Sequence, residues 1–101
     1  MYKVVYLPTA RQQLEDAVMY IAVDLCAPDA AMNLADEVDE AVHKLKEMPY
    51  RFPIYHTLYA MKHEIRSFPV KNYNIYYVIN EDTKTVEIWR VLHRLQKQDR
   101  S

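Results

Sequence analysis

The sequence predicts an α+β fold: an N-terminal strand, an antiparallel helical hairpin, then a three-stranded antiparallel meander. Two segments with apolar residues at three- and four-residue steps predict the helices. Three later segments, rich in tyrosine, isoleucine and valine and joined by short polar links, predict the strands. Because the helices are grouped apart from most of the strands, we expect them to pack on one sheet face. The length of 101 residues predicts a single domain, residues 1–101.

The chain opens with a short strand, YKVVYL, which has apolar residues on both faces and stops at Pro8. A helix of roughly four turns is predicted in TARQQLEDAVMYIAVDL. Thr9 and Gln12 fit a capping box, in which the side chains at a helix start satisfy free backbone amides. The apolar stripe of this helix contains Ala10, Leu14, Ala17, Val18, Ile21 and Leu25.

The second helix is predicted to follow the break CAPDA. Pro28 suits its first turn, and Asp29 suits the positive end of the helix dipole. Its stripe contains Ala31, Leu34, Ala35, Val38, Val42, Leu45 and Met48, and Pro49 closes it. So short a connection predicts a helical hairpin. Neither helix can bury its stripe fully against the other, so a sheet is required.

Residues 50–61 show no period and contain proline, which predicts a loop. Strands are predicted over residues 63–70, ending near Pro69, then over 72–80 and, after a polar turn at 81–84, over 85–93.

Simple alternation assigns the side chains of the last two strands to faces. In the last strand it places Trp89, Val91 and His93 on one face and Val86, Ile88, Arg90 and Leu92 on the other. In the middle strand Tyr73, Ile75, Tyr77 and Ile79 oppose Tyr76 and Val78. Both faces are too apolar to be left bare. The helices would cover one face, and the loop of residues 50–61, a second subunit or a partner protein would cover part of the other.

Composition excludes several classes of protein. Glycine is absent, which excludes glycine-rich phosphate loops, and no cofactor is expected. The single cysteine, Cys26, cannot form an internal disulfide, so a reducing compartment is expected. No signal peptide or apolar run of membrane length is present, which predicts a soluble, cytoplasmic protein. His43, His56 and His63 lack ligand spacing, so no metal site is expected.

The charge is unevenly distributed along the chain although the net charge is only −1. Residues 29–47 hold six acids and two lysines, a local sum of −4. Residues 90–101 hold four basic residues and one acid, a local sum of +3. The sequence therefore has an acidic middle and a basic end.

Five segments in order resemble the RelE/ParE superfamily of type II toxin–antitoxin toxins. They are VVYLPTA, LEDAVMYI, AVHKLKEMP, IRSFPVKNYNIYYVI and VEIWRVLHRLQKQDR. The resemblance implies a toxin neutralised by a cognate antitoxin whose disordered segment folds across its grooves and edges, giving a toxin–antitoxin hetero-oligomer. The antitoxin would cover the remaining apolar surface, with contacts at Trp89, Val91 and Tyr76.

The superfamily has two branches, which differ in their targets. RelE-like members cut mRNA on the ribosome. Here Arg66 and Arg90 would act on the phosphate and His93 would transfer protons. ParE-like members poison DNA gyrase without being nucleases. In this branch the target-binding residues would be Arg90, His93, Arg94, Lys97 and Arg100.

Three features favour the ParE-like branch. The tyrosine common after the last arginine of RelE-like sites is missing, and no lysine-rich segment replaces it. The net charge of −1 is unfavourable for phosphate contacts on the ribosome. The ending RVLHR and the long hairpin also resemble ParE-like toxins. A third interpretation is an inactive member that binds only the antitoxin and helps to repress their shared operon.

Each candidate also has a purely structural interpretation. Arg66 could pair with Glu64 or Glu87 across strands. His93 could be a hydrogen-bonded strand-end histidine, and Trp89 a sheet-packing residue. Arg94, Lys97 and Arg100 could be a solvated tail. Arg90 is harder to explain in this way, because an arginine on an apolar strand face needs partners.

Overall fold

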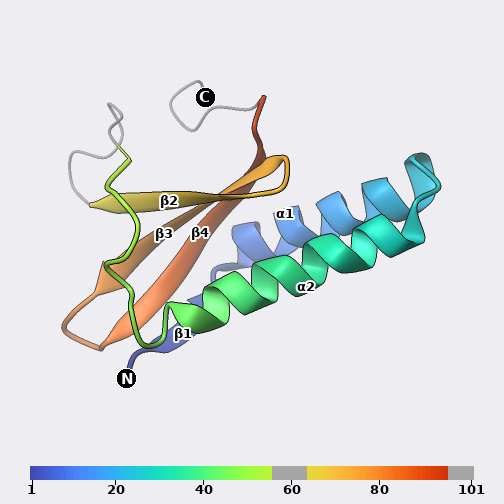
Figure 1. The fold of residues 1–101 in the computed structure, drawn as a ribbon. Helices are drawn as coiled ribbons and strands as arrows, with labels where there is room; N and C mark the ends of the chain where they lie inside the picture. The colour runs from blue at the N-terminus through green and yellow to red at the C-terminus, as the bar shows by residue number, and fades with distance from the viewer. Residues whose placement is uncertain (56–63, 96–101) are drawn as a thin grey trace.

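Figure 1 shows a twisted sheet with two antiparallel helices across one of its faces. This computed structural model describes residues 1–55 and 64–95. Its elements are β1 (Lys3–Tyr6), α1 (Pro8–Met19), a π-helical turn η1 (Tyr20–Asp24), α2 (Pro28–Lys44), β2 (Ile65–Val70), β3 (Tyr73–Asn80) and β4 (Thr85–His93). The predicted α+β fold, with a helical hairpin before a three-stranded antiparallel meander, is confirmed.

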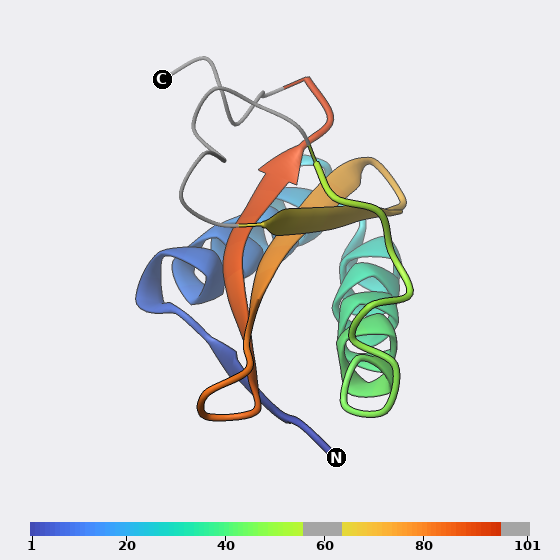
Figure 2. The same ribbon diagram turned by 90° about the vertical axis from the view of Figure 1, so that its left-hand side faces the viewer.

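The four strands lie in the order β1-β4-β3-β2. β1 pairs in parallel with the first half of β4, from Lys3 opposite Thr85 to Tyr6 opposite Ile88. The last strand in the sequence is therefore an inner strand of the sheet. Figure 2 shows the hairpin crossing behind this sheet, with the green segment after α2 running past β2.

The start of α1 differs from the prediction. The helix begins at Pro8, with Leu7 as the N-cap residue and no side-chain capping bond. The predicted capping box is wrong because Thr9 already lies inside the helix, where its hydroxyl cannot cap the first turn. Gln12 instead donates from Nε2 to Asp16 Oδ1 at 2.8 Å.

The second helix begins as predicted, with Pro28 in the first turn and Asp29 beside the free amides. It ends at Lys44, earlier than the apolar stripe suggested. Leu45 still lies in the core, whereas Met48 is 60% exposed. The predicted burial of the apolar stripe of the first helix is also wrong at its last residue. The wider π-turn rotates Leu25 outward, where it is 55% exposed.

The main core lies between the helical hairpin and the sheet. It unites the stripes of both helices with one face of all the long strands: Ala10, Leu14, Ala17, Leu34, Val38, Val42, Leu45, Phe68, Val70, Ile75, Tyr77, Val86, Ile88 and Val91. We call this side of the sheet the helix face. A smaller cluster on the other side, the far face, contains Ile65, Tyr76, Val78 and Leu92, with Tyr55 and Trp89 packed against it.

A β-bulge in β4 overturns the predicted faces of this strand. Tyr76 pairs with Arg90 and Tyr77 pairs with Ile88, so Trp89 is an extra residue in the ladder. A bulge turns two successive side chains to the same side and resets the alternation beyond it. Ile88 and Val91 consequently both face the helices. Trp89 was predicted to share a face with Val91 and His93, and this is wrong: it lies on the far face with Leu92.

The far face is partly covered by the segment of residues 49–55, which we call the edge segment. Ile54 forms a bridge with Arg66, and the Tyr55 N–H donates to the Ile65 carbonyl at 2.6 Å. The Tyr55 ring packs edge-on against Tyr76, with the ring centroids 4.9 Å apart. Of the three covers expected for this face, the loop of residues 50–61 contributes Tyr55, and residues 56–61 lie outside the described residues.

The absence of glycine has a structural consequence at the turns. Cys26, Lys71 and Lys84 each adopt a positive φ, between 52° and 53°, where glycine is usually found. The strand predicted over residues 63–70, ending near Pro69, is observed as β2, which runs from Ile65 to Val70 with Pro69 inside it. Proline is tolerated there because β2 is an edge strand of the sheet, where a missing N–H need not break a hydrogen bond to a neighbouring strand.

Candidate functional site

Arg66 lies on the helix face of β2, opposite Tyr77. Its Nη1 donates to the Phe52 carbonyl oxygen at 2.6 Å, and its guanidinium lies 4.9 Å from the centre of the Tyr50 ring. Among the described residues it forms no ion pair with Glu64 or Glu87, although such a pair was an alternative from the sequence. The contacts of Arg66 are therefore with the edge segment.

Arg90 lies on the far face, opposite Tyr76 and directly after Trp89. Its Nη1 donates to the Trp89 carbonyl oxygen at 2.9 Å, which holds the guanidinium against its own strand. The Trp89 ring is fixed in turn, since its Nε1 donates to Glu87 Oε1 at 3.1 Å. The bulge thus places an indole and a guanidinium side by side on one surface.

His93 ends β4 on the helix face, opposite Tyr73, with the two ring centroids 5.2 Å apart. The imidazole Nδ1 accepts a hydrogen bond from the Leu95 N–H at 3.2 Å. His93 thus turns the chain as it leaves the sheet.

The three residues proposed for RNA cleavage do not surround one point. Arg90 lies on the far face, whereas Arg66 and His93 lie on the helix face. On that face Arg66 pairs with Tyr77 and His93 with Tyr73, four residues apart on β3. Their backbones are therefore about 13 Å apart along the strands and about 10 Å apart across them. A metal-free nuclease needs its base and cations around a single phosphate.

The target-binding candidates are likewise divided between two faces. Arg94 follows His93, is exposed, and donates its N–H to the Asn72 carbonyl at 2.7 Å. Arg90 and His93 lie on opposite faces near the C-terminal end of β4, and Arg94 follows the strand. Lys97 and Arg100 lie outside the described residues.

The antitoxin-binding candidates also separate. Tyr76 and Trp89 pack in the far-face cluster. Val91 belongs to the main core, where it is only 3% exposed. Its backbone N–H donates to Gln13 Oε1 at 2.8 Å, so α1 and not a neighbouring strand satisfies this amide.

Sequence reasoning missed two grooves beside Tyr20, on the helix face where the hairpin leaves the sheet. The first, about 470 Å³, lies between α1 and the end of β4 and includes Gln13, Asp16 and Val91 in its walls. The second, about 250 Å³, lies beneath η1 and is lined by Ile21, Leu25 and Leu34 among others. Tyr20, Tyr73 and His93 line both grooves. The one signal in the sequence was Tyr20, a large aromatic residue outside the apolar stripe.

A second missed cluster joins three distant parts of the chain. The Glu81 carboxylate accepts from the Tyr2 hydroxyl at 2.8 Å, from Lys84 Nζ at 2.6 Å and from the Tyr50 hydroxyl. The bond from Lys84, followed by those from the two tyrosines, lowers the pKa of Glu81 to about 2. The bond to Glu81 raises the pKa of Tyr50 to about 12. This exposed cluster anchors the start of the edge segment to the β3–β4 turn.

Two further classes of site are absent from residues 1–55 and 64–95. No group of three histidine, cysteine or acidic side chains there could hold a metal ion, and His56 and His63 lie outside this range. No helix in the same residues is long and apolar enough to cross a membrane.

Comparisons with known proteins identify the family. Residues 4–98 match the sequence family described as the ParE toxin of the type II toxin–antitoxin system parDE. A comparison with curated protein sequences gives no match.

Two solved structures share the fold. A chain of the chromosomal ParDE system from P. aeruginosa superposes with a TM-score of 0.72 at 15% identity, covering 92% of this chain and 96% of that one. A chain of the RelBE2 toxin–antitoxin complex from Mycobacterium tuberculosis superposes with a TM-score of 0.61 at 25% identity, covering 92% and 98%. The family match spans nearly the whole sequence, and the chain therefore belongs to the ParE family of type II toxin–antitoxin toxins, within the RelE/ParE superfamily.

Proposed function

We propose that this toxin inhibits growth by poisoning DNA gyrase in the cytoplasm and that a cognate antitoxin neutralises it. The observation that carries the proposal is the separation of Arg66, Arg90 and His93 onto two faces of the sheet. This arrangement is unsuited to acid–base chemistry at one phosphate, whereas docking onto a protein makes no such demand. Membership of the ParE family supports the same target.

Arg90 is the residue through which we expect the target to be recognised. It stands beside Trp89 on the bulge, and each side chain is fixed by a hydrogen bond within β4. Arginine and tryptophan are enriched among the residues that dominate the binding energy of protein interfaces. His93, Arg94, Lys97 and Arg100 would extend this contact from the end of β4.

The antitoxin is expected to cover the far-face cluster at the half-buried Trp89, with Tyr76, only 3% exposed, lying beneath the contact. It would form a hetero-oligomer with the toxin, as the named ParDE and RelBE2 assemblies suggest. Val91 is less suited to this role than the sequence suggested, because it already packs in the main core.

A ribosome-dependent endonuclease is the second candidate, and one observation favours it. Residues 12–43 contain eight acids and no lysine or arginine, so the rest of the chain holds the other six acids and all thirteen basic residues, a formal charge of +7. A surplus of basic residues outside residues 12–43 could contact RNA phosphates. In that case Arg66 and Arg90 would bind different phosphates, since they lie on opposite faces.

Gyrase supercoiling inhibition tests the proposal, with Arg90→Ala compared against Arg11→Ala. Arg11 is a suitable control because it is an exposed arginine on α1, stacked 4.5 Å from the centre of the Tyr6 ring. We expect wild type and Arg11→Ala to inhibit gyrase equally and Arg90→Ala to lose about tenfold or more in potency. Equal potency of all three proteins would exclude Arg90 as the contact residue, and no inhibition by wild type would exclude gyrase as the target.

A further inference from the structure

The two edge strands of the sheet differ in length. A strand at the edge of a sheet presents backbone N–H and C=O groups that can pair with another chain, and proteins usually protect such edges. At one edge β1 has only 4 residues, which leaves little backbone for pairing. At the other edge β2 has 6 residues, from Ile65 to Val70. The longer edge is the one beside which the edge segment lies.

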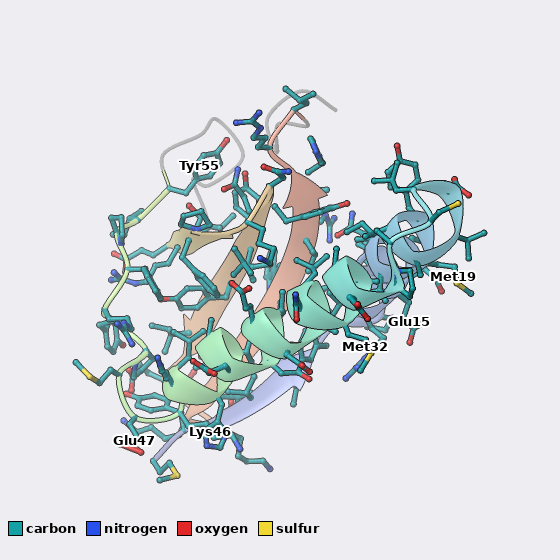
Figure 3. The ribbon with its side chains drawn as sticks, turned by 45° about the vertical axis from the view of Figure 1, so that its right-hand side comes forward. Glu15, Met19, Met32, Lys46, Glu47 and Tyr55 are labelled. Carbon is teal, nitrogen blue, oxygen red and sulfur yellow. The ribbon has the colours of Figure 1, made fainter. Side chains whose placement is uncertain are left out.

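The edge segment covers the outer side of β2. The Ile65 carbonyl accepts from the Tyr55 N–H at 2.6 Å, and the Ser67 N–H donates to the Pro53 carbonyl at 3.4 Å. Alternate residues of an antiparallel strand direct their backbone groups to the same side, so Ile65, Ser67 and Pro69 turn theirs away from β3. Proline adds no N–H to this outer side. Figure 2 shows the segment running past β2, and Figure 3 shows Tyr55 near its end.

Side chains from the sheet hold this cover in place. With β2 the segment forms an isolated bridge, Ile54 opposite Arg66, and no regular strand. The Arg66 guanidinium donates to the Phe52 carbonyl at 2.6 Å, and the buried Tyr77 hydroxyl donates to the Pro49 carbonyl at 2.6 Å. A segment that is attached through a few such contacts can open locally while the strands beneath it stay folded.

We propose that the edge segment keeps the toxin monomeric by covering a strand edge at which a second copy of this chain can otherwise pair. When the segment opens, the outer side of β2 is exposed. The β2 strands of two opened copies then pair antiparallel about a two-fold axis, with Ser67 opposite its counterpart and Ile65 opposite Pro69. This inference goes beyond the proposed function and does not depend on the target of the toxin.

The properties of β2 favour a second copy as the partner. Two identical strands related by a two-fold axis are self-complementary, because each offers the donors and acceptors that the other needs. Ser67 lies at the centre of this pairing and turns both its backbone groups outward. Of the residues of β2 only Arg66 is charged, and its side chain lies on the helix face. Charge repulsion therefore does not protect this edge, and the edge segment must do so.

Two variants that each remove one contact of the edge segment test the proposal. In these release variants, Arg66→Ala and Tyr77→Phe, the segment should open more often. Both copies must open before they pair, so a rise of about tenfold in the open fraction tightens the apparent dimer dissociation constant about a hundredfold. Analytical ultracentrifugation of the full-length toxin measures this constant.

Matched controls are Arg11→Ala and Tyr6→Phe, whose side chains contact each other and Asp39, away from the edge segment. We expect wild type and both controls to remain monomeric at about 100 μM, and each release variant to dimerise at least about tenfold more tightly than wild type. If Arg66→Ala does not fold, Tyr77→Phe, which keeps the aromatic ring, decides alone.

Charged residues at Ser67 test the two-fold pairing itself. Added to a release variant, Ser67→Glu or Ser67→Lys places like charges opposite each other and should restore the monomer. Mixing the glutamate and lysine proteins should restore the dimer, because opposite charges then meet. Ser67 is half-buried, and its bond to Pro53 uses only the backbone, so these changes should leave the edge segment in place.

Three results would each overturn the proposal. One is a folded release variant that dimerises no more tightly than wild type. Another is association that neither charge at Ser67 suppresses, which would indicate aggregation through some other surface. The last is a mixture of the two oppositely charged proteins that stays monomeric. The assay contains no gyrase, so its failure is distinct from a failure of the proposed target.

Discussion

The Arg66 guanidinium is hydrogen bonded to the Phe52 carbonyl oxygen at 2.6 Å, which joins β2 to a segment fourteen residues earlier in the chain. The same guanidinium lies over the Tyr50 ring, and the Phe52 ring stacks on Phe68 with centroids 4.5 Å apart. Arg66, for which the sequence predicted a role in phosphate chemistry, therefore holds the edge segment in place. Its partners lie in the edge segment before β2, outside the strands, so rules for strand pairing could not identify them.

Replacing Arg66 with alanine should destabilise the fold. The change leaves the half-buried Phe52 carbonyl without its charged donor, and hydrogen bonds to charged groups contribute about 1.5–3 kcal/mol. Urea denaturation of Arg66→Ala should therefore show a loss of roughly 2 kcal/mol in the free energy of unfolding. Arg11→Ala, the control, should lose under about 0.5 kcal/mol. Equal stability of the two variants would contradict this role of Arg66.

Gln13 should stabilise the second half of β4. Val91 lies beyond the pairing with β1, which stops at Tyr6 opposite Ile88, and its N–H donates to Gln13 Oε1 at 2.8 Å. Gln13→Met keeps the length of the side chain but removes the acceptor, at a cost of about 1–3 kcal/mol for an unsatisfied amide. Gln12→Met, on the exposed side of α1, is the control and should lose under about 0.5 kcal/mol. Fast hydrogen exchange at Val91 in Gln13→Met alone would support the assignment, and unchanged exchange would refute it.

The Glu81 cluster should make stability depend on acid pH. The pKa of Glu81 is lowered from its ordinary value of 4.5 to about 2 by Lys84 and the two tyrosines. A depressed pKa contributes stability that is fully present above pH 4.5 and is lost as the pH falls toward 2. Glu81→Gln should therefore be less stable than wild type near neutral pH, and the difference should shrink below about pH 4.

The matched control for this experiment is Glu47→Gln. Glu47 is exposed and forms no ion pair among the described residues. Its effect on the urea midpoint should be small and should not vary with pH in the same range. A constant difference between wild type and Glu81→Gln from neutral to acid pH would show that the cluster contributes no pH-dependent stability.

The basic end after β4 should contribute to gyrase poisoning through its charge. Deleting residues 94–101 removes Arg94, Lys97 and Arg100, and also the bond from the Arg94 N–H to the Asn72 carbonyl. Replacing the three basic residues with glutamine removes their charge alone. Both variants should lose potency by about tenfold, and the loss should diminish as salt is raised. Full potency of both variants would identify the end as a solvated tail.

Much of the fold could be predicted because the spacing of the apolar residues and the positions of the prolines and polar links agree along the chain. The apolar stripes of the two helices, Pro28 at the start of the second, and the tyrosine-rich strands each specify one element. The polar link at residues 81–84 is too short to join two parallel strands, so it predicts an antiparallel pair. The order β1-β4-β3-β2 was not predicted, since the pairing of a four-residue edge strand depends on long-range packing.

The arrangement of the site could not be predicted from alternation. One extra residue at Trp89 reverses the faces of all that follows, and nothing in EIWRVL marks the bulge. The capping box failed for a related reason, because Pro8 can begin a helix one residue before Thr9. The contacts of Arg66 with the edge segment and the grooves beside Tyr20 arise only from the three-dimensional packing.

Parallel assays of the wild-type toxin on its two candidate targets test the central claim most directly. One reaction contains gyrase and supercoiled plasmid, and cleaved DNA is trapped with detergent and protease. The other is a translating extract in which mRNA is mapped by primer extension. We expect cleaved DNA to accumulate with toxin concentration while the mRNA remains intact. Cleaved mRNA with no trapped DNA would contradict the account and identify a ribosome-dependent nuclease instead.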